Sequence, residues 1–181
     1  EWHKIGNKYL DSLKKINPHK KKYITDKMPH NFMMCGIIHK MLPYAKIIYC
    51  YRDPMDNCFS LYRNTFAKSG HGYSYDQDKL VLHYNLHIKL MNHWKEVLGD
   101  KILLFKNETL IDDQKGVTSK LLDHCDLEWE DTCLEFYKTE RDVRTISLRQ
   151  VRNPINKNSL GVWKKYSGSF DKMNESLKEF S

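Results

Sequence analysis

The segment Ala45–Tyr51, which reads Ala-Lys-Ile-Ile-Tyr-Cys-Tyr, indicates the architecture of this chain more clearly than any other segment. It is rich in β-branched and aromatic residues and shows no regular alternation of apolar and polar positions, which is typical of a strand buried on both faces of a parallel sheet. Asp53 and Pro54 follow closely, and these residue types favour the N-cap and the first turn of a helix. We therefore predict a strand that leads directly into a helix.

The rest of the sequence alternates between helical and strand-like patterns. Apolar residues recur at helical spacing in Trp2–Ile16 and along a long segment from Asp76 to Leu98. Two more short strands are predicted at Tyr23–Thr25 and Ile102–Phe105. Further helices are expected at residues 29–42, 54–66, 116–125 and 130–138, followed by an irregular stretch at 139–169 and a polar helix from Phe170. This alternation favours an α/β fold with a parallel sheet, and the length fits a single domain over residues 1–181.

The composition narrows the classes of protein to which the chain can belong. Hydrophobic residues make up 40% of the sequence, which is too many for a disordered chain. No apolar run approaches the length of a membrane span, so none is expected. The five cysteines are odd in number and form no Cys-x-x-Cys pair, which indicates a reducing compartment such as the cytoplasm and no structural zinc. Cys50 lies in the predicted strand and is expected to be buried.

The distribution of positive charge indicates a polyanionic ligand. The net charge is +7, and Lys outnumbers Arg by 24 to 6. Four of the six arginines nevertheless lie together in residues 141–152, and arginine offers a planar, bidentate grip on oxyanions that lysine lacks. The cluster is either an oxyanion site or a solvated basic face. The sequence contains no recognised nucleic-acid-binding motif, so nucleic acid is not the expected partner.

Two charged residues occupy the places where parallel sheets bind ligands, beyond the carboxyl ends of the strands. Arg52 follows the Ala45–Tyr51 strand and precedes a helix N-terminus, whose free N–H groups and dipole favour an anion. Ser60 lies two turns along that helix and could donate its hydroxyl to the same anion. The alternative is a surface salt bridge of Arg52 with a neighbouring aspartate. Lys27 follows the Tyr23–Thr25 strand, and the alternative there is one more surface lysine.

His83 and His87 are spaced as metal ligands on a helix would be. The pattern lacks the glutamate of zinc peptidases, and Tyr84 and Ile88 next to them belong to the expected core. We therefore predict packing rather than metal binding, and no metal cofactor.

The motifs occur in an order that resembles a known family. The chain contains four such segments, at Thr25–Phe32, at Tyr51–Asp56 with Ser60, at Leu90–Trp94 and at Arg144–Ile155, which Ser159–Trp163 completes. Together they resemble the bacterial sulfotransferases that are often fused to tetratricopeptide repeats and, more distantly, the tyrosylprotein sulfotransferases. The resemblance covers roughly residues 20 to 168. Each motif is weak alone, but the ordered set is specific.

The resemblance implies a P-loop-NTPase-like, three-layer α/β/α fold and a reaction that needs no metal. The reaction is transfer of a sulfuryl group from 3′-phosphoadenosine 5′-phosphosulfate (PAPS) to a hydroxyl acceptor, such as a protein tyrosine. Arg52 and Ser60 match the pair that binds the 3′-phosphate. Lys27 and Ser147 match residues that stabilise charge during transfer. The segment 147–156 matches the loop around the nucleotide, which makes Ser147, Gln150, Val151, Arg152 and Asn156 candidate nucleotide-binding residues.

The sequence also departs from the family. The Pro-x-Ser-Gly-Thr-Thr loop that cradles the 5′-phosphosulfate is absent, and so are the first strand of the sheet and the catalytic glutamate. Asn107 stands where relatives have a nucleotide-contacting tyrosine, and Val162 where some have a basic residue. Without the first strand, the remaining strands expose unpaired edges. We expect the chain alone to be truncated, inactive and poorly stable, or to be completed by an upstream segment or a second copy.

Two interpretations remain open at this point. The chain is either part of a working sulfotransferase or a catalytically dead remnant that binds PAP-like nucleotides or other polyanions, where PAP is adenosine 3′,5′-bisphosphate. A P-loop kinase-like domain is disfavoured, because the Arg-Thr-x-Ser-x-x-Gln-Val-Arg segment has no place in one. The acceptor is open among a peptide tyrosine, a sugar hydroxyl and a small metabolite.

Overall fold

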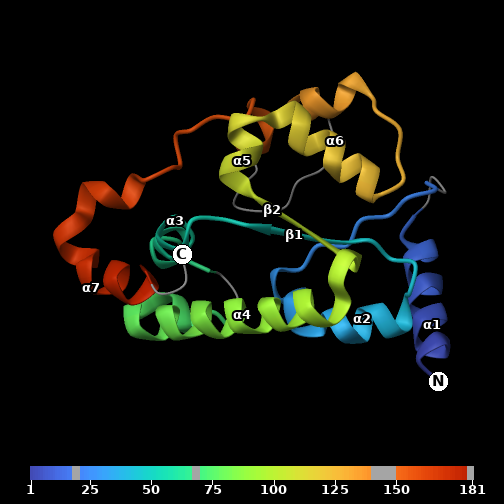
Figure 1. Ribbon diagram of the computed structural model, residues 1–181, viewed down its shortest axis with the longest axis horizontal. Coiled ribbons are helices and arrows are strands. Elements are labelled where there is room, and N and C mark those ends of the chain that lie inside the picture. The colour runs from blue at the N-terminus through green and yellow to red at the C-terminus, as the bar shows by residue number, and fades with distance from the viewer. Residues whose placement is uncertain (18–20, 67–69, 140–149, 179–181) are drawn as a thin grey trace. The chain divides into compact units, whose positions relative to one another are not determined.

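The computed structural model describes residues 1–17, 21–66, 70–139 and 150–178 of the chain (Figure 1). The chain divides into two compact units. The first consists of Glu1–Ile47 and Leu86–Ile102, and the second of Ile48–Asn85 and Leu103–Ser181. The prediction of a single domain over 1–181 stays a prediction, and each unit is described by itself.

The predicted α/β class with a parallel sheet is confirmed. The strands β1 (Ile47–Tyr51) and β2 (Ile102–Lys106) are neighbours in a small parallel sheet. Parallel strands need a long crossover connection, and here it contains the helices α3 (Pro54–Tyr62) and α4 (Gln77–Leu98). Both strands were predicted from sequence, each to within two residues at either end.

Two predictions about the sheet are wrong. Residues 23–25 do not form a strand, and Tyr23 and Ile24 are 56% and 44% exposed. A strand needs a neighbour for its N–H and C=O groups, and none of the described residues pairs with this segment. In addition, β1 is not buried on both faces, since Ile48 and Tyr51 are exposed and so is the Cys50 thiol. A strand of a parallel sheet is buried on both faces only where helices cover both sides of the sheet, and the exposed residues of β1 are not covered in this way by the described part of the chain.

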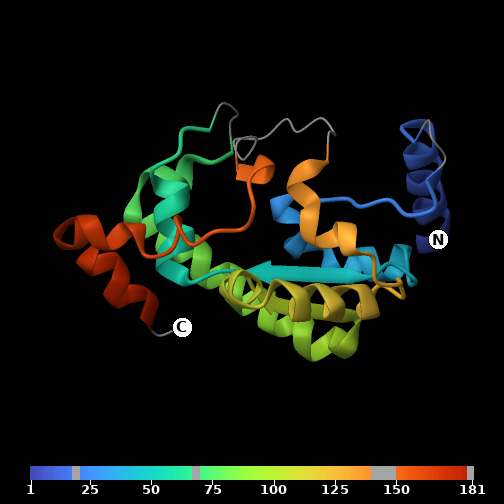
Figure 2. The same ribbon diagram turned by 90° about the horizontal axis from the view of Figure 1, so that it is seen from above.

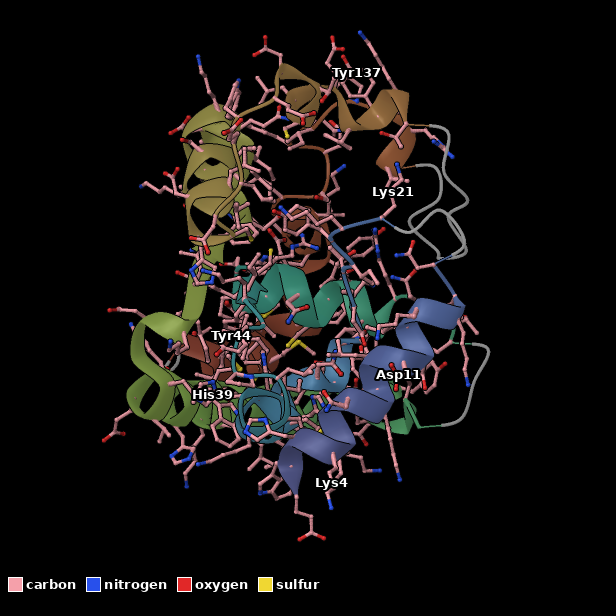
Figure 3. All side chains as sticks on the ribbon, turned by 90° about the vertical axis from the view of Figure 1, so that its right-hand side faces the viewer. Lys4, Asp11, Lys21, His39, Tyr44 and Tyr137 are labelled. Carbon is pink, nitrogen blue, oxygen red and sulfur yellow. The ribbon has the colours of Figure 1, made fainter. Side chains whose placement is uncertain are left out.

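The first unit is built from helices. Its helices are α1 (Trp2–Lys15), the 3₁₀ helix η1 (Pro29–Met34), α2 (Cys35–Met41), the C-terminal part of α4 and the short 3₁₀ helix η3 (Gly99–Lys101). The predicted helix over 29–42 is therefore 3₁₀ in its first part. Lys4 and Asp11 project from α1 into solvent (Figure 3). On its inner side, buried Gly6 lies directly against the backbone carbonyl of Met41, so α1 packs closely on the end of α2.

Trp94 of α4 contacts both η1 and α2 in this unit. Its indole Nε1 donates a hydrogen bond to the Phe32 carbonyl oxygen at 2.7 Å. Its ring also covers Gly36, where a Cβ atom would lie 2.7 Å from the nearest ring carbon. The ring of His87, one of the two histidines with metal-ligand spacing, packs edge-on against Phe32 with 4.5 Å between ring centroids. His87 is thus a packing residue, as predicted, and Trp94 packs in the same unit.

The contact between Gly36 and Trp94 gives a stability prediction. Gly36→Ala is expected to lower the free energy of unfolding by about 1–3 kcal/mol, because the new methyl group overlaps a ring that cannot move without breaking its hydrogen bond. Gly168→Ala is the matched control, because Gly168 also lies in a helix and has open space around it. That change should raise stability by roughly 0.5–1 kcal/mol. Urea denaturation of the two variants checks both values, and equal effects would contradict the predicted overlap.

Besides most of β1 and β2, the second unit contains further helical elements. They are α3, the first part of α4, η2 (Gly72–Tyr75), α5 (Asn107–Asp112), α6 (Gln114–His124), η4 (Asp131–Lys138), η6 (Gln150–Arg152), η7 (Val162–Tyr166) and α7 (Ser167–Leu177). Its core includes Met55, Cys58, Phe59, Leu80, Tyr84, Val117, Phe170, Met173 and Leu177. The apolar spacing from Asp76 to Leu98 predicted one buried face along this helix, and the burial of Leu80 and Tyr84 confirms it for the first part of α4.

The closing helix differs from its prediction as a polar helix. Phe170, Met173 and Leu177 lie on one face of α7 and are buried. This face packs on α3, beside which α7 lies in Figures 1 and 2. The Phe170 ring contacts the Phe59 ring edge-on, with 5.2 Å between centroids. Three apolar residues at helical spacing are enough to bury one face, although the other residues of α7 are polar, charged or glycine.

Candidate functional site

The turn between β1 and α3 forms as the sequence predicts. The Asp53 carboxylate caps α3 by accepting a hydrogen bond from the Asp56 N–H at 3.0 Å, and Pro54 occupies the first helical position. The backbone N–H of Asp53 donates to Oε1 of Glu108 at 3.1 Å. The expectation of free N–H groups at this helix end therefore needs a correction. The chain's own carboxylates already satisfy part of this end, so the helix N-terminus alone does not account for an anion site.

Arg52 is held at the carboxyl end of β1 in a half-buried position. Its Nη2 donates to the carbonyl oxygen of Ser159 at 3.5 Å, the upper limit for a hydrogen bond. Its Nε is buried and has no hydrogen-bond partner among the described residues. None of the ion pairs found in the described part of the chain involves Arg52, so the alternative of a salt bridge with Asp53 or Asp56 is not observed. A buried donor without a partner costs about 1–3 kcal/mol, so a polar acceptor fits here.

Two acidic residues of this region were missed by the sequence analysis. Asp56 is only 6% exposed, and both of its carboxylate oxygens accept from the Gly161 N–H, at 2.8 and 3.0 Å. Burial is the main cause that raises the pKa of Asp56; the Gly161 hydrogen bond lowers it, and nearby Asp53 raises it. Glu108 is the second residue of α5, which follows β2, and its Oε2 is buried without a partner among the described residues. The position of Glu108 just beyond the carboxyl end of a predicted parallel strand was the sequence feature that could have indicated a site residue.

Ser60 lies on α3, in the same unit as Arg52, and is half-buried. Its backbone carbonyl oxygen accepts a hydrogen bond from Asn64 Nδ2 at 2.6 Å. The structure thus confirms the local setting of both residues, an arginine at the strand end and a serine two turns along the following helix. Their joint role as a phosphate-binding pair stays a prediction.

The predicted nucleotide loop is described in part. Ser147 lies outside the described residues. Gln150, Val151 and Arg152 form the short helix η6, in which Val151 is half-buried and Arg152 exposed. Asn156 is also exposed, and its side chain stays within its own turn by accepting from the Asn158 N–H at 3.1 Å. The structure brings the residues that follow this loop, Ser159 and Gly161, to Arg52 and Asp56.

Lys27 belongs to the first unit and is exposed. The segment that carries it is tied to α1 by a hydrogen bond from the Tyr9 hydroxyl to the neighbouring Asp26 carboxylate. This bond is the main cause that raises the pKa of Tyr9 to about 12. The role of Lys27 in the reaction stays a prediction.

The remaining sequence predictions concern metals and membranes. In the described part of the chain, no group of three or more His, Cys, Asp or Glu side chains is arranged to hold a metal ion. The His83 ring instead stacks on Tyr73, with 3.9 Å between ring centroids. No described helix is both long and apolar enough to span a bilayer.

Comparison with known proteins identifies the family. The model of the sulfotransferase family matches residues 2–131, which include Lys27, Arg52 and Ser60 but not the loop at 147–156. An uncharacterised protein of Aquifex aeolicus (strain VF5) is 36% identical to the chain over 173 residues. That alignment covers 94% of this chain but 23% of the relative, so the chain spans about a quarter of the protein it matches. Because the family match extends over most of the chain and contains the strand-end arginine with the helix behind it, the chain belongs to the sulfotransferase family.

Proposed function

We propose that the chain binds the nucleotide of PAPS and is part of an enzyme that transfers the sulfuryl group of PAPS to a hydroxyl acceptor. The observation that carries this proposal is the position of Arg52 at the carboxyl end of β1, with a buried Nε that has no partner among the described residues. A phosphate oxygen is a strong acceptor for a guanidinium group, and the pair is strengthened by charge. The net charge of +7 favours the approach of a multiply charged nucleotide.

The proposed roles follow the resemblance residue by residue. Arg52 and Ser60 hold the 3′-phosphate, and Gln150, Val151, Arg152 and Asn156 border the nucleotide. Lys27 and Ser147 stabilise the charge that develops on the transferring group.

The proposed reaction depends on positioning and charge stabilisation, as phosphoryl transfer does. The acceptor oxygen attacks sulfur, the bond between sulfur and the 5′-phosphate oxygen breaks, and the acceptor proton passes to a general base. The phosphosulfate loop and the catalytic glutamate of the family do not occur in these residues. We therefore propose that residues 1–181 bind the nucleotide, whereas transfer requires the longer protein.

The incomplete sheet supports the same division of roles. The described sheet has two strands, so β1 and β2 each leave one edge unpaired, and two-stranded sheets are marginally stable by themselves. We propose that an upstream segment or a second copy of the chain completes the sheet in a cytoplasmic protein.

Transfer of labelled sulfate from PAPS tests the proposal. We expect the full-length natural protein to label one of three acceptors, a tyrosine peptide, an oligosaccharide or a small phenol, and residues 1–181 to label none. Both proteins should bind PAP in calorimetry. Binding of PAP without transfer in either protein would favour a remnant that only binds nucleotides. Absence of PAP binding in both would overturn the proposed function.

A further inference from the structure

The structure contains one buried contact that the proposed function leaves unused. The Asp56 carboxylate and the Gly161 N–H are 105 residues apart in sequence, and both carboxylate oxygens accept from that one N–H, at 2.8 and 3.0 Å. Gly161 has a φ of +64°, a conformation that disfavours residues with a Cβ atom. The turn is therefore built around a glycine whose N–H points at a buried carboxylate.

Two other contacts involve the same turn, residues 157–161. Arg52 Nη2 approaches the Ser159 carbonyl oxygen at 3.5 Å, and Lys157 Nζ forms an ion pair with Asp112 Oδ1 at 2.6 Å. The ion pair is exposed and contributes little to stability. Of the three contacts, the one between Asp56 and Gly161 involves a buried side chain. We therefore expect this contact to determine where residues 157–161 lie.

Asp56 is not needed as a helix cap, since Asp53 already provides the cap of α3 by accepting from the Asp56 N–H. Burial itself disfavours the charge of the Asp56 side chain, and so do the acidic neighbours Asp53 and Glu108, whereas the Gly161 hydrogen bond and nearby Arg52 favour it. A buried carboxylate of this kind is stable only when it is hydrogen-bonded. Its partner is the turn that directly follows the predicted nucleotide loop.

We propose that Asp56 is a positioning residue, which clamps the turn 157–161 to α3 and so holds residues 150–156, the described part of the predicted nucleotide loop, for nucleotide binding. This inference rests on the proposed function. Asp56 lies in the first turn of α3, and Arg52 lies four residues earlier, in the short link between β1 and α3. The clamp and the proposed phosphate-binding arginine are therefore close together along the chain. Removing the clamp allows the loop to move, and the nucleotide then has to order the loop when it binds.

The test compares Asp56→Ala, Asp56→Asn and Asp56→Glu in the full-length protein. Asp56→Ala removes the acceptor and should weaken PAP binding roughly 5- to 30-fold, as expected for one lost buried hydrogen bond. Asp56→Asn keeps an acceptor oxygen and should bind PAP within about threefold of the parent protein. Asp56→Glu keeps the charge but displaces the acceptor by one methylene group, and it should bind more weakly than Asp56→Asn.

Asp113→Ala is the matched control, because Asp113 also accepts from a glycine N–H, that of Gly116, at 2.8 Å, but at the start of α6. It should leave PAP affinity unchanged. Hydrogen exchange of the 157–166 region gives a second readout and should accelerate in Asp56→Ala and not in Asp113→Ala.

Each outcome bears on the inference. Faster exchange in Asp56→Ala with unchanged PAP affinity would show a clamp without a role in binding and would overturn it. If Asp56→Ala does not fold, the other two variants decide, and stronger binding by Asp56→Glu than by Asp56→Asn would overturn it in favour of a charge effect. If the parent protein does not bind PAP, the proposed function itself fails, whereas a loss of affinity confined to Asp56→Ala and Asp56→Glu supports both.

Discussion

Arg52→Ala should weaken the binding of PAP by about 10- to 100-fold, which corresponds to the roughly 1.5–3 kcal/mol expected for hydrogen bonds to a charged group. The same substitution should barely change the binding of adenosine 5′-monophosphate, which lacks the 3′-phosphate. The reason is geometric, because Arg52 follows β1 at the sheet edge where ligands of parallel sheets bind, and its only described side-chain hydrogen bond is the long one to Ser159. Calorimetric titration with the two nucleotides measures the difference.

Arg63→Ala is the control for loss of charge. Arg63 is exposed at the C-terminal end of α3, with its guanidinium 5.6 Å from the Phe59 ring centroid. Its removal changes the net charge by the same amount but should lower PAP affinity less than about threefold, because exposed charges are screened by salt. Arg52→Lys should fall between the parent protein and Arg52→Ala, since it keeps the charge but loses the bidentate fork. Equal weakening by Arg52→Ala and Arg63→Ala, or equal weakening for both nucleotides, would contradict the assignment of the 3′-phosphate site.

The features that were predictable from sequence are those that short segments determine by themselves. The transition from β1 to α3 was predicted from a β-rich run followed by a capping aspartate and a proline, and Asp53 and Pro54 take up those positions. The long helix α4 was predicted from its apolar spacing, and Leu80, Tyr84 and Met91 are buried along it. Local sequence specifies these elements because capping and amphipathic packing involve residues within a few turns of one another.

The features that were missed depend on distant partners. Residues 23–25 have strand-forming side chains, but a strand exists only with a neighbour, and no described segment pairs with them. The contacts of Asp56 with Gly161 and of Arg52 with Ser159 join residues more than 100 positions apart. A single side chain that binds a distant backbone group leaves no periodic signal in the sequence. Asp56 was therefore considered only as a salt-bridge partner of Arg52, whereas the structure shows it holding a turn.

Lys27→Ala should lower kcat for sulfuryl transfer by about 10²- to 10³-fold, the loss typical of removing one group that stabilises charge in a transition state. PAP affinity should remain within about threefold of the parent protein, because an interaction made mainly in the transition state contributes little to binding of the product nucleotide. The prediction rests on the proposed function and is measured by single-turnover transfer from PAPS in the full-length protein, using whichever acceptor that protein labels.

Because Lys27 is exposed, this test separates an effect on kcat from an effect on the free energy of unfolding. Replacement of an exposed lysine usually changes the free energy of unfolding by less than about 0.5 kcal/mol, so a slow Lys27→Ala enzyme should still unfold at the parent temperature. Lys22→Ala is the matched control, since Lys22 is an exposed lysine of the same segment and lies 5.0 Å from the Tyr23 ring centroid. It should retain at least about half of the parent kcat, because a surface change of this kind is close to neutral.

Equal loss of kcat in the two variants would mean that the segment's overall charge, rather than Lys27 itself, assists transfer. An unchanged kcat in Lys27→Ala would remove Lys27 from the reaction while leaving the Arg52 site untouched.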